Sequence, residues 1–336
     1  MSRKSSSGPK KPPAVPRPSS SIMLLSPTNQ LLLLHRVQTS SSFASAHVFP
    51  GGNLSAFHET IPAEGSAERH LDGPAYRIAA IRETFEESGI LLSQAEGEGN
   101  GLLHLSEDIA EAGRKAIHGD KVRFTDWLEG VGGTPDVDNL IPFTRWVTPT
   151  TVPKRFTTQM YVYMLPLSTD VDSELVVHTP THDGGLEHTA AQFDDVATWL
   201  SRADKGEVIL YPPQLYLLTL LGQFLTGKGD YAAQRAALSA FLAKVPTGDL
   251  PHPTANISWG DKSMSPVPIP IKRADGRTTV GLDTPGPELA GSGRGGDYDH
   301  VVVVNFAKIG SSKMEVRSRK EVLAEAEAEK AKQAKL

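Results

Sequence analysis

The 336-residue sequence contains no cysteine. This absence excludes disulfide scaffolds, thiolate zinc fingers, iron–sulfur clusters and cysteine nucleophiles, so any ligand must bind through oxygen or nitrogen. The sequence also lacks an apolar run near the roughly 18 residues that a membrane span needs, since residues 31–34 and 301–304 are only strand-length. An excess of basic charge is missing too. With 34 Lys and Arg against 39 Asp and Glu, the net charge of −5 argues against a nucleic-acid-binding protein.

The chain is long enough for a large domain with an appended extension. Hydrophobic residues make up 39% and charged residues 22% of it, which is typical of a folded protein. We expect residues 1–20 to be a disordered basic Ser/Pro arm, because they can bury little apolar surface. Order should begin near Ile22. We assign 21–246 to the main domain, 247–310 to a Pro/Gly-rich extension with one strand, and 311–336 to a charged helical tail.

Apolar spacing predicts the elements of the main domain. Two apolar runs joined by residues 26–30 predict a β-hairpin, and the spacing at 74–88 predicts a helix that Gly89 ends. The mixed order of strands and helices favours an α+β or mixed-sheet core in layers. We further expect strands at 46–49, 157–165 and 301–306, and helices at 107–117, 193–203, 213–226, 231–245 and from 320 onward, with the rest of 95–140 irregular.

The strongest chemical signal lies in residues 82–90, Arg-Glu-Thr-Phe-Glu-Glu-Ser-Gly-Ile. On a helix, Glu83, Glu86 and Glu87 stand at i, i+3 and i+4, so three carboxylates share one face. A hard divalent cation such as Mg²⁺ or Mn²⁺ would relieve their repulsion, because these ions prefer carboxylate and water oxygens and often share them with phosphates. A solvated acidic face is the alternative interpretation.

These residues resemble the signature of the Nudix hydrolases, G-x5-E-x7-R-E-U-x-E-E-x-G-U, in which U is apolar. The second half matches at Arg82, Glu83, Glu86, Glu87, Gly89 and Ile90, and Gly52 matches the opening glycine. About sixteen extra residues separate Gly52 from the helix. They leave the first Glu of the signature unplaced, because His58 stands at the ungapped position and Glu59 one residue further on. The partner of Arg82 is therefore open.

The resemblance implies a Nudix α/β/α sandwich (α/β or α+β class) with a mixed curved sheet, enlarged by insertions and a C-terminal extension. It implies that Glu83, Glu86 and Glu87 ligate Mg²⁺ or Mn²⁺ and that Arg82 belongs to the catalytic set. The reaction would be hydrolysis of a substrate diphosphate. Members of the family place the general base variably. Glu187 is one candidate, with an ordinary surface Glu as the alternative.

Residues 32–52 are similar to the Nudix branch that cleaves coenzyme A. Arg36 and the run Phe-Pro-Gly-Gly at 49–52 keep the spacing of that branch, although positions 34, 37, 41 and 45 depart from its strict pattern. The enlarged insertion and segments 146–149 and 153–156 resemble the peroxisomal acyl-coenzyme A diphosphatases. The resemblance implies cleavage of coenzyme A or its esters to 3′,5′-ADP and (acyl-)phosphopantetheine. We expect substrate to be bound by Arg36, Gly51, Gly52, Lys154 and Arg155, although each cation could be an ordinary surface one.

Two other activities stay open. One is a Nudix diphosphatase for NADH or ADP-ribose, and the other is a catalytically silent Nudix binding module. The sequence does not give the acyl-chain preference, the metal used in the cell, the oligomeric state, or a role for the basic arm and for residues 247–300.

The last three residues, Ala334, Lys335 and Leu336, resemble the Ser-Lys-Leu address that the peroxisomal import receptor reads. We therefore expect a peroxisomal protein, with a cytoplasmic or mitochondrial location as the alternatives.

Two further patterns favour a structural interpretation. Residues 291–296 satisfy G-x-G-x-x-G but precede a strand instead of opening a helix, which predicts a flexible loop. We interpret His178, His182 and His188, with Asp183, as loop residues and not zinc ligands, because Pro180 prevents helical spacing. Trp146 is expected in the core.

Overall fold

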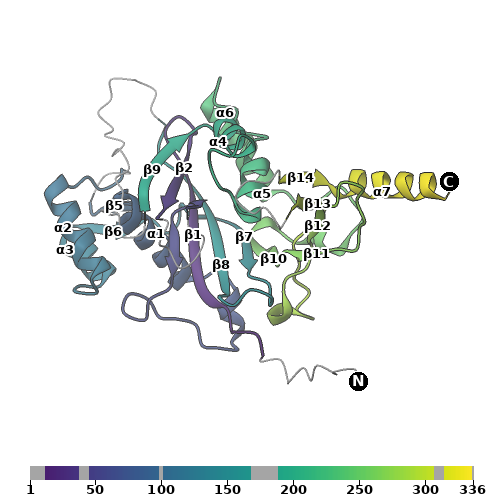
Figure 1. Cartoon of the computed structure of the whole chain (residues 1–336). Helices are drawn as coiled ribbons and strands as arrows, with labels where there is room; N and C mark the ends of the chain where they lie inside the picture. The colour runs from purple at the N-terminus through teal and green to yellow at the C-terminus, as the bar shows by residue number, and fades with distance from the viewer. Residues whose placement is uncertain (1–11, 38–44, 98–100, 168–187, 306–313, 335–336) are drawn as a thin grey trace.

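A mixed sheet with helices on both faces forms the centre of the molecule (Figure 1). The computed structural model describes residues 12–37, 45–97, 101–167, 188–305 and 314–334. Within these ranges the sheet has eight strands: β1 (Arg17–Leu25), β2 (Leu31–Arg36), β3 (His47–Val48), β4 (Gly51–Asn53), β7 (Ile141–Val147), β8 (Phe156–Met164), β9 (His188–Asp194) and β10 (Ser263–Met264). The short strands β5 (Ser93–Ala95) and β6 (Gly133–Pro135) pair separately.

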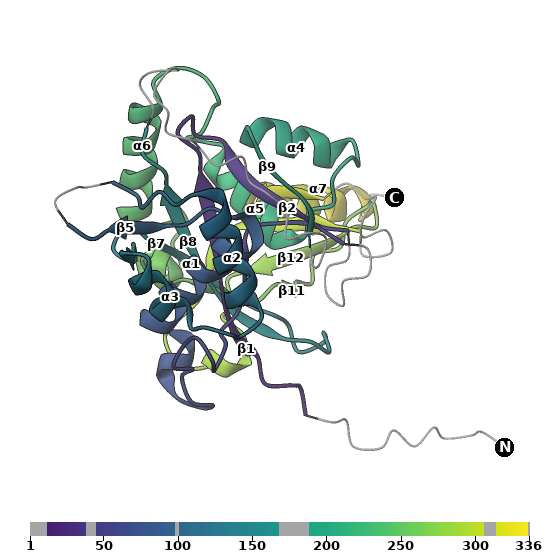
Figure 2. The same ribbon diagram turned by 90° about the vertical axis from the view of Figure 1, so that its left-hand side faces the viewer.

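The helices divide between the two faces of this sheet. One face carries α1 (Pro74–Ser88), α2 (Glu107–His118) and α3 (Phe124–Gly130), and Figure 2 looks onto this side. The other face carries α4 (Val196–Asp204), α5 (Pro212–Leu221) and α6 (Tyr231–Ala243). The predicted α/β/α sandwich is therefore confirmed. Among the described residues, no helix is long and apolar enough to cross a bilayer.

Strand β1 lies in the middle of the sheet and is buried on both faces. It pairs in parallel with β8 over its whole length, from Arg17 opposite Phe156 to Leu25 opposite Met164, and antiparallel with β2 and β4. Side chains alternate along it, so Ile22 lies in the core beneath α1, and Met23 lies in the core beneath α4 and α5. Burial on both faces explains why residues 22–25 are continuously apolar.

The start of β1 corrects our prediction of a disordered arm over residues 1–20. The strand begins at Arg17, five residues before Ile22, and Ser19, Ser20 and Ser21 are buried. Ser19 Oγ hydrogen-bonds Thr158 Oγ1 at 2.6 Å. Backbone pairing and hydroxyl contacts order this segment although its side chains are polar, and composition alone could not show that. Residues 1–11 lie outside the described residues.

The helix that carries the acidic cluster forms as predicted. Its first residue is Pro74, and it ends at Gly89, whose φ of 76° is left-handed. Ile81 and Phe85 are fully buried against the sheet. The opposite side of α1 therefore presents its carboxylates next to β4.

Two predictions about the main domain were wrong. The region 95–140, expected to hold a single helix, also contains α3, β5 and β6. Residues 193–194 belong to β9 because Phe193 pairs with Leu32 of β2, so helix α4 starts only at Val196. Strand β7 has no counterpart among our predicted elements. The remaining predicted helices occur within a few residues of their expected bounds.

The C-terminal extension is more than one strand. It adds β10 to the main sheet and builds a second sheet from β11 (Val267–Pro268), β12 (Thr278–Leu282), β13 (Asp297–Val304) and β14 (Glu315–Ser318), beside α7 (Arg319–Gln333). Short 3₁₀ turns accompany the chain at η1 (Ala67–His70), η2 (Pro253–Asn256), η3 (Trp259–Asp261) and η4 (Pro287–Leu289). In Figure 1, α7 (yellow) points away from the main sheet.

The boundaries predicted at 246/247 and 310/311 do not separate independent units. Trp259, Met264 and Val302 of the extension share one hydrophobic core with Met23 and Leu33 of the main sheet. Strands β13 and β14, which lie on either side of the second boundary, pair with each other. Pro and Gly content marked the region correctly as rich in turns but did not reveal that its apolar residues pack on the main domain.

Candidate active site

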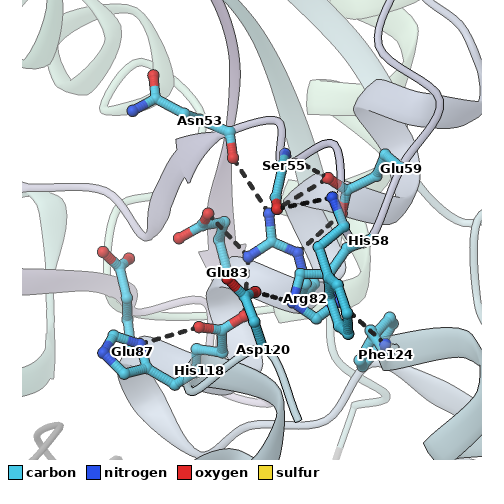
Figure 3. Close-up of polar contacts among 12 residues, drawn as sticks. Asn53, Ser55, His58, Glu59, Arg82, Glu83, Glu87, His118, Asp120 and Phe124 are labelled. Carbon is cyan, nitrogen blue, oxygen red and sulfur yellow. Dashed lines mark hydrogen bonds and ion pairs between the residues drawn. The ribbon is translucent and has the colours of Figure 1, made fainter. Parts of the chain in front are cut away.

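A buried arginine is the centre of the acidic cluster on α1. Arg82 donates from Nε to Glu59 Oε1 at 2.7 Å and from Nη1 to Glu86 Oε1 at 2.8 Å, and Nη1 also lies 3.0 Å from Glu83 Oε1 (Figure 3). Its Nη2 donates to the Asn53 carbonyl at 3.1 Å. Burial opposes its charge, but the carboxylates around it outweigh burial and raise the pKa of Arg82 above its ordinary value.

These contacts identify the partner of Arg82 that the sequence left open. It is Glu59, whose side chain is only 1% exposed. Glu59 is held in place by the Ser55 N–H, which donates to Oε2 at 2.7 Å. Nearly all of the inserted residues therefore lie between Glu59 and α1, where they form η1 and the segment that leads into the helix.

Two glycines of β4 lie directly against the carboxylates. The Gly51 N–H donates to Glu87 Oε2 at 2.7 Å. Gly51 has a φ of 152°, and a Cβ there would lie 2.6 Å from Ser21 Cα. A Cβ on Gly52 would lie 2.5 Å from Glu83 Cδ. Gly51 is therefore required by the close approach of β4 to β1, and Gly52 by the close approach of β4 to α1.

Two residues of helix α2 contact Glu86. His118 Nδ1 lies 3.1 Å from Glu86 Oε2, and Arg114 Nη2 donates to the Glu86 carbonyl at 2.8 Å. Sequence reasoning predicted α2 but missed both residues. Their i, i+4 spacing places them on one face of the helix, and this was the available signal.

His58, which stands at the ungapped position of the signature, has a structural contact instead. Its Nδ1 accepts from the Phe124 N–H at 3.1 Å, so its Nε2 carries the proton and faces Asp120 Oδ1 at 3.2 Å. These two contacts connect the segment around Glu59 to Asp120, in the loop after α2, and to the start of α3 (Figure 3).

The cluster carries more negative than positive charge. One guanidinium faces the carboxylates of Glu59, Glu83 and Glu86. Burial raises the pKa of Glu83 to about 7, because the attraction of Arg82 compensates only part of the cost of desolvation. Glu87, held by the Gly51 N–H, is a fourth carboxylate at this site, so negative charge exceeds that of the one guanidinium and would favour a bound cation.

The donor set fits Mg²⁺ or Mn²⁺ through Glu83 and Glu87. Arg82 and His118 contact both oxygens of Glu86, whereas Glu83 meets Arg82 through Oε1 and Glu87 accepts the Gly51 N–H through Oε2. Of the three predicted carboxylates we therefore favour Glu83 and Glu87 as ligands. Among the described residues, no group of three or more His, Asp or Glu side chains is arranged to hold a metal ion. Oxygen ligands, supplemented by water and phosphate, are what these ions prefer.

Arg36, predicted to bind substrate, lies at the end of β2, and that role stays a prediction. It follows Leu32 and Leu34 along β2 on the face covered by α1, and its partner across to β9 is His188. His188 Nε2 lies 3.7 Å from Glu87 Oε1. The interpretation of His188 as a loop residue was wrong, since it is fully buried in β9. Glu187, His178, His182 and Asp183 lie outside the described residues.

Arg155 is not part of the cluster, contrary to our prediction. It is buried just before β8, at the end of the sheet where Arg17 begins, whereas Gly51 pairs with Ser21 further along. Its guanidinium forms an ion pair with Glu288 and donates to the carbonyls of Thr148 and Ala14. Arg155 therefore anchors the C-terminal extension. Lys154 precedes it on the surface, outside the cluster. Trp146 is buried in the core, as expected.

Comparisons with known proteins agree with this geometry. Residues 57–221, which include α1, match the family model described as the NUDT19 Nudix domain. The chain is 30% identical over 205 residues to "Putative nudix hydrolase 7" of Caenorhabditis elegans, covering 61% of this chain and 60% of that protein. It is 29% identical over 244 residues to "Acyl-coenzyme A diphosphatase NUDT19" of Gallus gallus, covering 58% of this chain and 61% of that protein.

Among solved structures, a NUDIX hydrolase from Alicyclobacillus acidocaldarius matches with 24% identity and a TM-score of 0.47, over 61% of this chain and 90% of that one. The chain spans about 60% of the length of the two curated relatives. The family model covers the acidic helix and both flanking layers of the sandwich. The chain therefore belongs to the Nudix superfamily and resembles its NUDT19 members.

Proposed function

We propose that this chain is a Nudix hydrolase that uses Mg²⁺ or Mn²⁺ to cleave the diphosphate of coenzyme A or of acyl-coenzyme A. The products are 3′,5′-ADP and phosphopantetheine or its acylated form. The observation that carries the proposal is the buried cluster of Glu59, Glu83 and Glu86 around the single guanidinium of Arg82, next to the glycines of β4. The name of the Gallus gallus relative supports the choice of substrate.

The reaction adds water across one phosphoanhydride bond. The oxygen of water releases its protons to the surrounding solvent and forms a new bond to phosphorus, while the bond to the bridging oxygen breaks and the leaving phosphate keeps its electron pair. A bound Mg²⁺ or Mn²⁺ supplies charge stabilisation for the diphosphate and lowers the pKa of water. Glu83 and Glu87 are the residues that would hold it.

The other residues of the cluster keep these two carboxylates in place. Arg82 is fixed by Glu59 on one side and by Glu86 on the other, so it can hold Glu83 at 3.0 Å. The Gly51 N–H holds Glu87 at 2.7 Å. Arg36, on the neighbouring strand beside His188, is the cation that we expect to face the substrate phosphates.

The test is product analysis on the purified chain. Coenzyme A is incubated with Mg²⁺ or Mn²⁺, and 3′,5′-ADP is followed by chromatography. We expect Glu83→Gln and Glu87→Gln each to lower turnover at least 100-fold, since a positioned charge-stabilising group is worth this much. Glu129→Gln, an exposed carboxylate on α3, is the matched control and should keep full turnover.

Substrate choice is tested in the same assay with 3′-dephospho-coenzyme A, NADH and ADP-ribose. A preference for coenzyme A over its 3′-dephospho form supports the proposal. Turnover of NADH or ADP-ribose without turnover of coenzyme A would replace the proposed substrate with another diphosphate. No turnover of any of them would favour a binding module.

The peroxisomal location stays a proposal. Helix α7 carries Ala334 away from the main sheet (Figure 1), while Lys335 and Leu336 lie outside the described residues. An N-terminally tagged chain should gather in peroxisomes, and deletion of Leu336 should release it. A cytoplasmic or mitochondrial pattern for the intact chain would contradict the proposal.

A further inference from the structure

The residues just before α1 are held in place by contacts from other parts of the chain. Gly73, the residue before α1, offers no side chain to cap the helix. The preceding residues, His70 to Asp72, come from the insertion, and the Leu71 side chain is 42% exposed. Contacts that other parts of the chain make to residues 70–72 therefore help to fix where the helix begins.

Contacts from several parts of the chain hold this segment. His70 Nδ1 lies 3.0 Å from Thr157 Oγ1, and Arg77 of α1 forms an ion pair with Asp72 at 2.6 Å. Three more contacts come from β8, β7 and the C-terminal extension. Tyr161 of β8 donates from its hydroxyl to Asp72 Oδ1 at 2.6 Å. Arg145 of β7 donates from Nη2 to the Leu71 carbonyl at 2.8 Å. Arg294 of the C-terminal extension donates from Nη1 to the His70 carbonyl. The last contact joins residues that are 224 positions apart in the sequence.

Arg294 is itself fixed within the extension. Its Nε and Nη2 donate to the Asp261 carbonyl at 3.0 and 2.8 Å. Two residues on, Gly296 packs so closely that a Cβ would lie 2.5 Å from Met264 Cγ. The buried Lys262 donates from Nζ to the Gly296 carbonyl at 3.0 Å. The glycine-rich run 291–296 does not open a helix. It thus positions Arg294 against the Asp261 and His70 carbonyls.

The C-terminal extension also contacts Arg145, the other arginine that holds the start of α1. Strand β10 pairs with β7 so that Ser263 lies opposite Arg145, and the Arg145 N–H donates to the Lys262 carbonyl at 2.8 Å. The Arg145 side chain is fully buried and lies over the Tyr76 ring at 4.5 Å. The contacts of Arg145 and Arg294 at the start of α1 therefore both depend on residues 261–296.

We propose that Arg294 is a positioning residue, through which the C-terminal extension fixes the start of α1 and thereby the placement of Glu83 and Glu87. An α-helix transmits a shift at one end along its length, because its backbone hydrogen bonds keep it rigid. A movement of His70 and Leu71 therefore displaces the carboxylates of α1 relative to β4. The extension is then part of the catalytic unit and not an appendage.

The first test does not depend on the proposed activity. Hydrogen exchange of the full chain is followed in peptides over residues 67–77, whose Leu71 and Tyr76 amides are hydrogen-bonded. In Arg294→Ala we expect exchange there to rise at least tenfold, with β13 unchanged. The control is Arg273→Ala, an arginine of the same extension that pairs with Asp275 and Glu325 near α7. Unchanged exchange at 67–77 in Arg294→Ala would overturn the proposal.

The second test separates positioning from general stability. Mn²⁺ binding to the substrate-free chain should weaken at least threefold in Arg294→Ala and stay unchanged in Arg273→Ala. If the chain hydrolyses coenzyme A, kcat should fall while KM stays within twofold. Arg294→Lys, which can still donate to the His70 carbonyl, should restore part of both effects. Equal losses in the alanine and lysine variants, or in Arg294→Ala and Arg273→Ala, would contradict positioning. Loss of activity on every substrate would reject the proposed function and leave the exchange and Mn²⁺ results to decide this one.

Discussion

Arg82 and Glu59 form the buried ion pair that joins the insertion to the acidic helix, with 2.7 Å between Nε and Oε1. Neither residue can be lost alone without leaving a charge in the interior. The pair also explains how an insertion of this length is compatible with the site. The chain leaves the site after Glu59 and returns at α1, so the extra residues lie outside the cluster.

Glu59→Gln should weaken this link. One charge-assisted hydrogen bond is lost, so we expect the free energy of unfolding to fall by about 2 kcal/mol, as measured by urea denaturation. The control is Glu64→Gln, whose carboxylate is 73% exposed and 4.0 Å from Arg69. That variant should stay within about 0.5 kcal/mol of the parent. Equal decreases in the free energy of unfolding of both variants would show that the Glu59–Arg82 ion pair contributes no more than an exposed one.

The buried Glu83 predicts an unusual pH dependence of the metal-free protein. Its pKa is raised to about 7 from a value of 4.5 in the unfolded chain, so the folded state favours the protonated form. The resulting stability is complete below pH 4.5 and is lost as the pH rises through 7. Glu83→Gln should remove this loss and be the more stable protein at pH 8, by up to about 3 kcal/mol.

Unfolding curves in EDTA at pH 5 and pH 8 test this, and Glu129→Gln should behave like the parent. Adding Mg²⁺ at pH 8 should stabilise the parent but not Glu83→Gln, because the ion balances the charge. A parent protein whose stability does not fall between these two pH values would contradict the assignment of Glu83 as an uncompensated buried carboxylate.

Asp297 and His300 predict a second, separate pH effect. Burial opposes protonation of His300, but the hydrogen bond to Asp297 at 2.7 Å outweighs it and raises the pKa of His300 above 6.5. Stability from this pair is complete below pH 6.5 and is lost as the pH rises through the higher pKa of the folded state. His300→Gln should destabilise the protein by about 1 kcal/mol at pH 6 and less at pH 9. The exposed His104→Gln is the control, and a pH-independent loss in His300→Gln would reject the charge effect.

Gly52→Ala should affect catalysis more than folding. The new methyl group would overlap the Glu83 carboxylate, which can move, so the fold should persist while turnover falls at least tenfold. Gly130→Ala, at the end of α3 with no atom within 4 Å of the added Cβ, is the matched control. Circular dichroism and the coenzyme A assay are measured on both. Full activity in Gly52→Ala would show that Glu83 does not need its position against β4.

The parts of the fold that the sequence predicted depend on local interactions. Helix α1 was predicted to the residue, because Pro74, the apolar spacing and Gly89 all act within the helix itself. Strand β1 was predicted too short, because Ser19 and Ser20 are ordered by pairing with β8, which lies far along the chain. Their polar side chains carry no sign of that partner.

The same distinction applies to the candidate site. The acidic face of α1 and the glycines of β4 follow a recognisable spacing, whereas Glu59 and His118 reach the cluster only through tertiary contacts. Arg155 was assigned to substrate on its charge and on the resemblance of segment 153–156 to the coenzyme A diphosphatases. Its acid partner, Glu288, is more than a hundred positions away, so sequence reasoning could not show that its charge was already used.

The parallel pairing of β1 with β8 has a consequence for the biosynthesis of this protein. Ser19 meets Thr158 across 139 residues, and at about 5–20 residues per second the ribosome needs roughly ten to thirty seconds to make that length. During this time the central strand β1, whose residues 22–25 are fully buried in the folded protein, has no partner on one of its edges. The nascent chain is therefore a natural client for chaperones until β8 emerges, and fragments that end before residue 156 should aggregate.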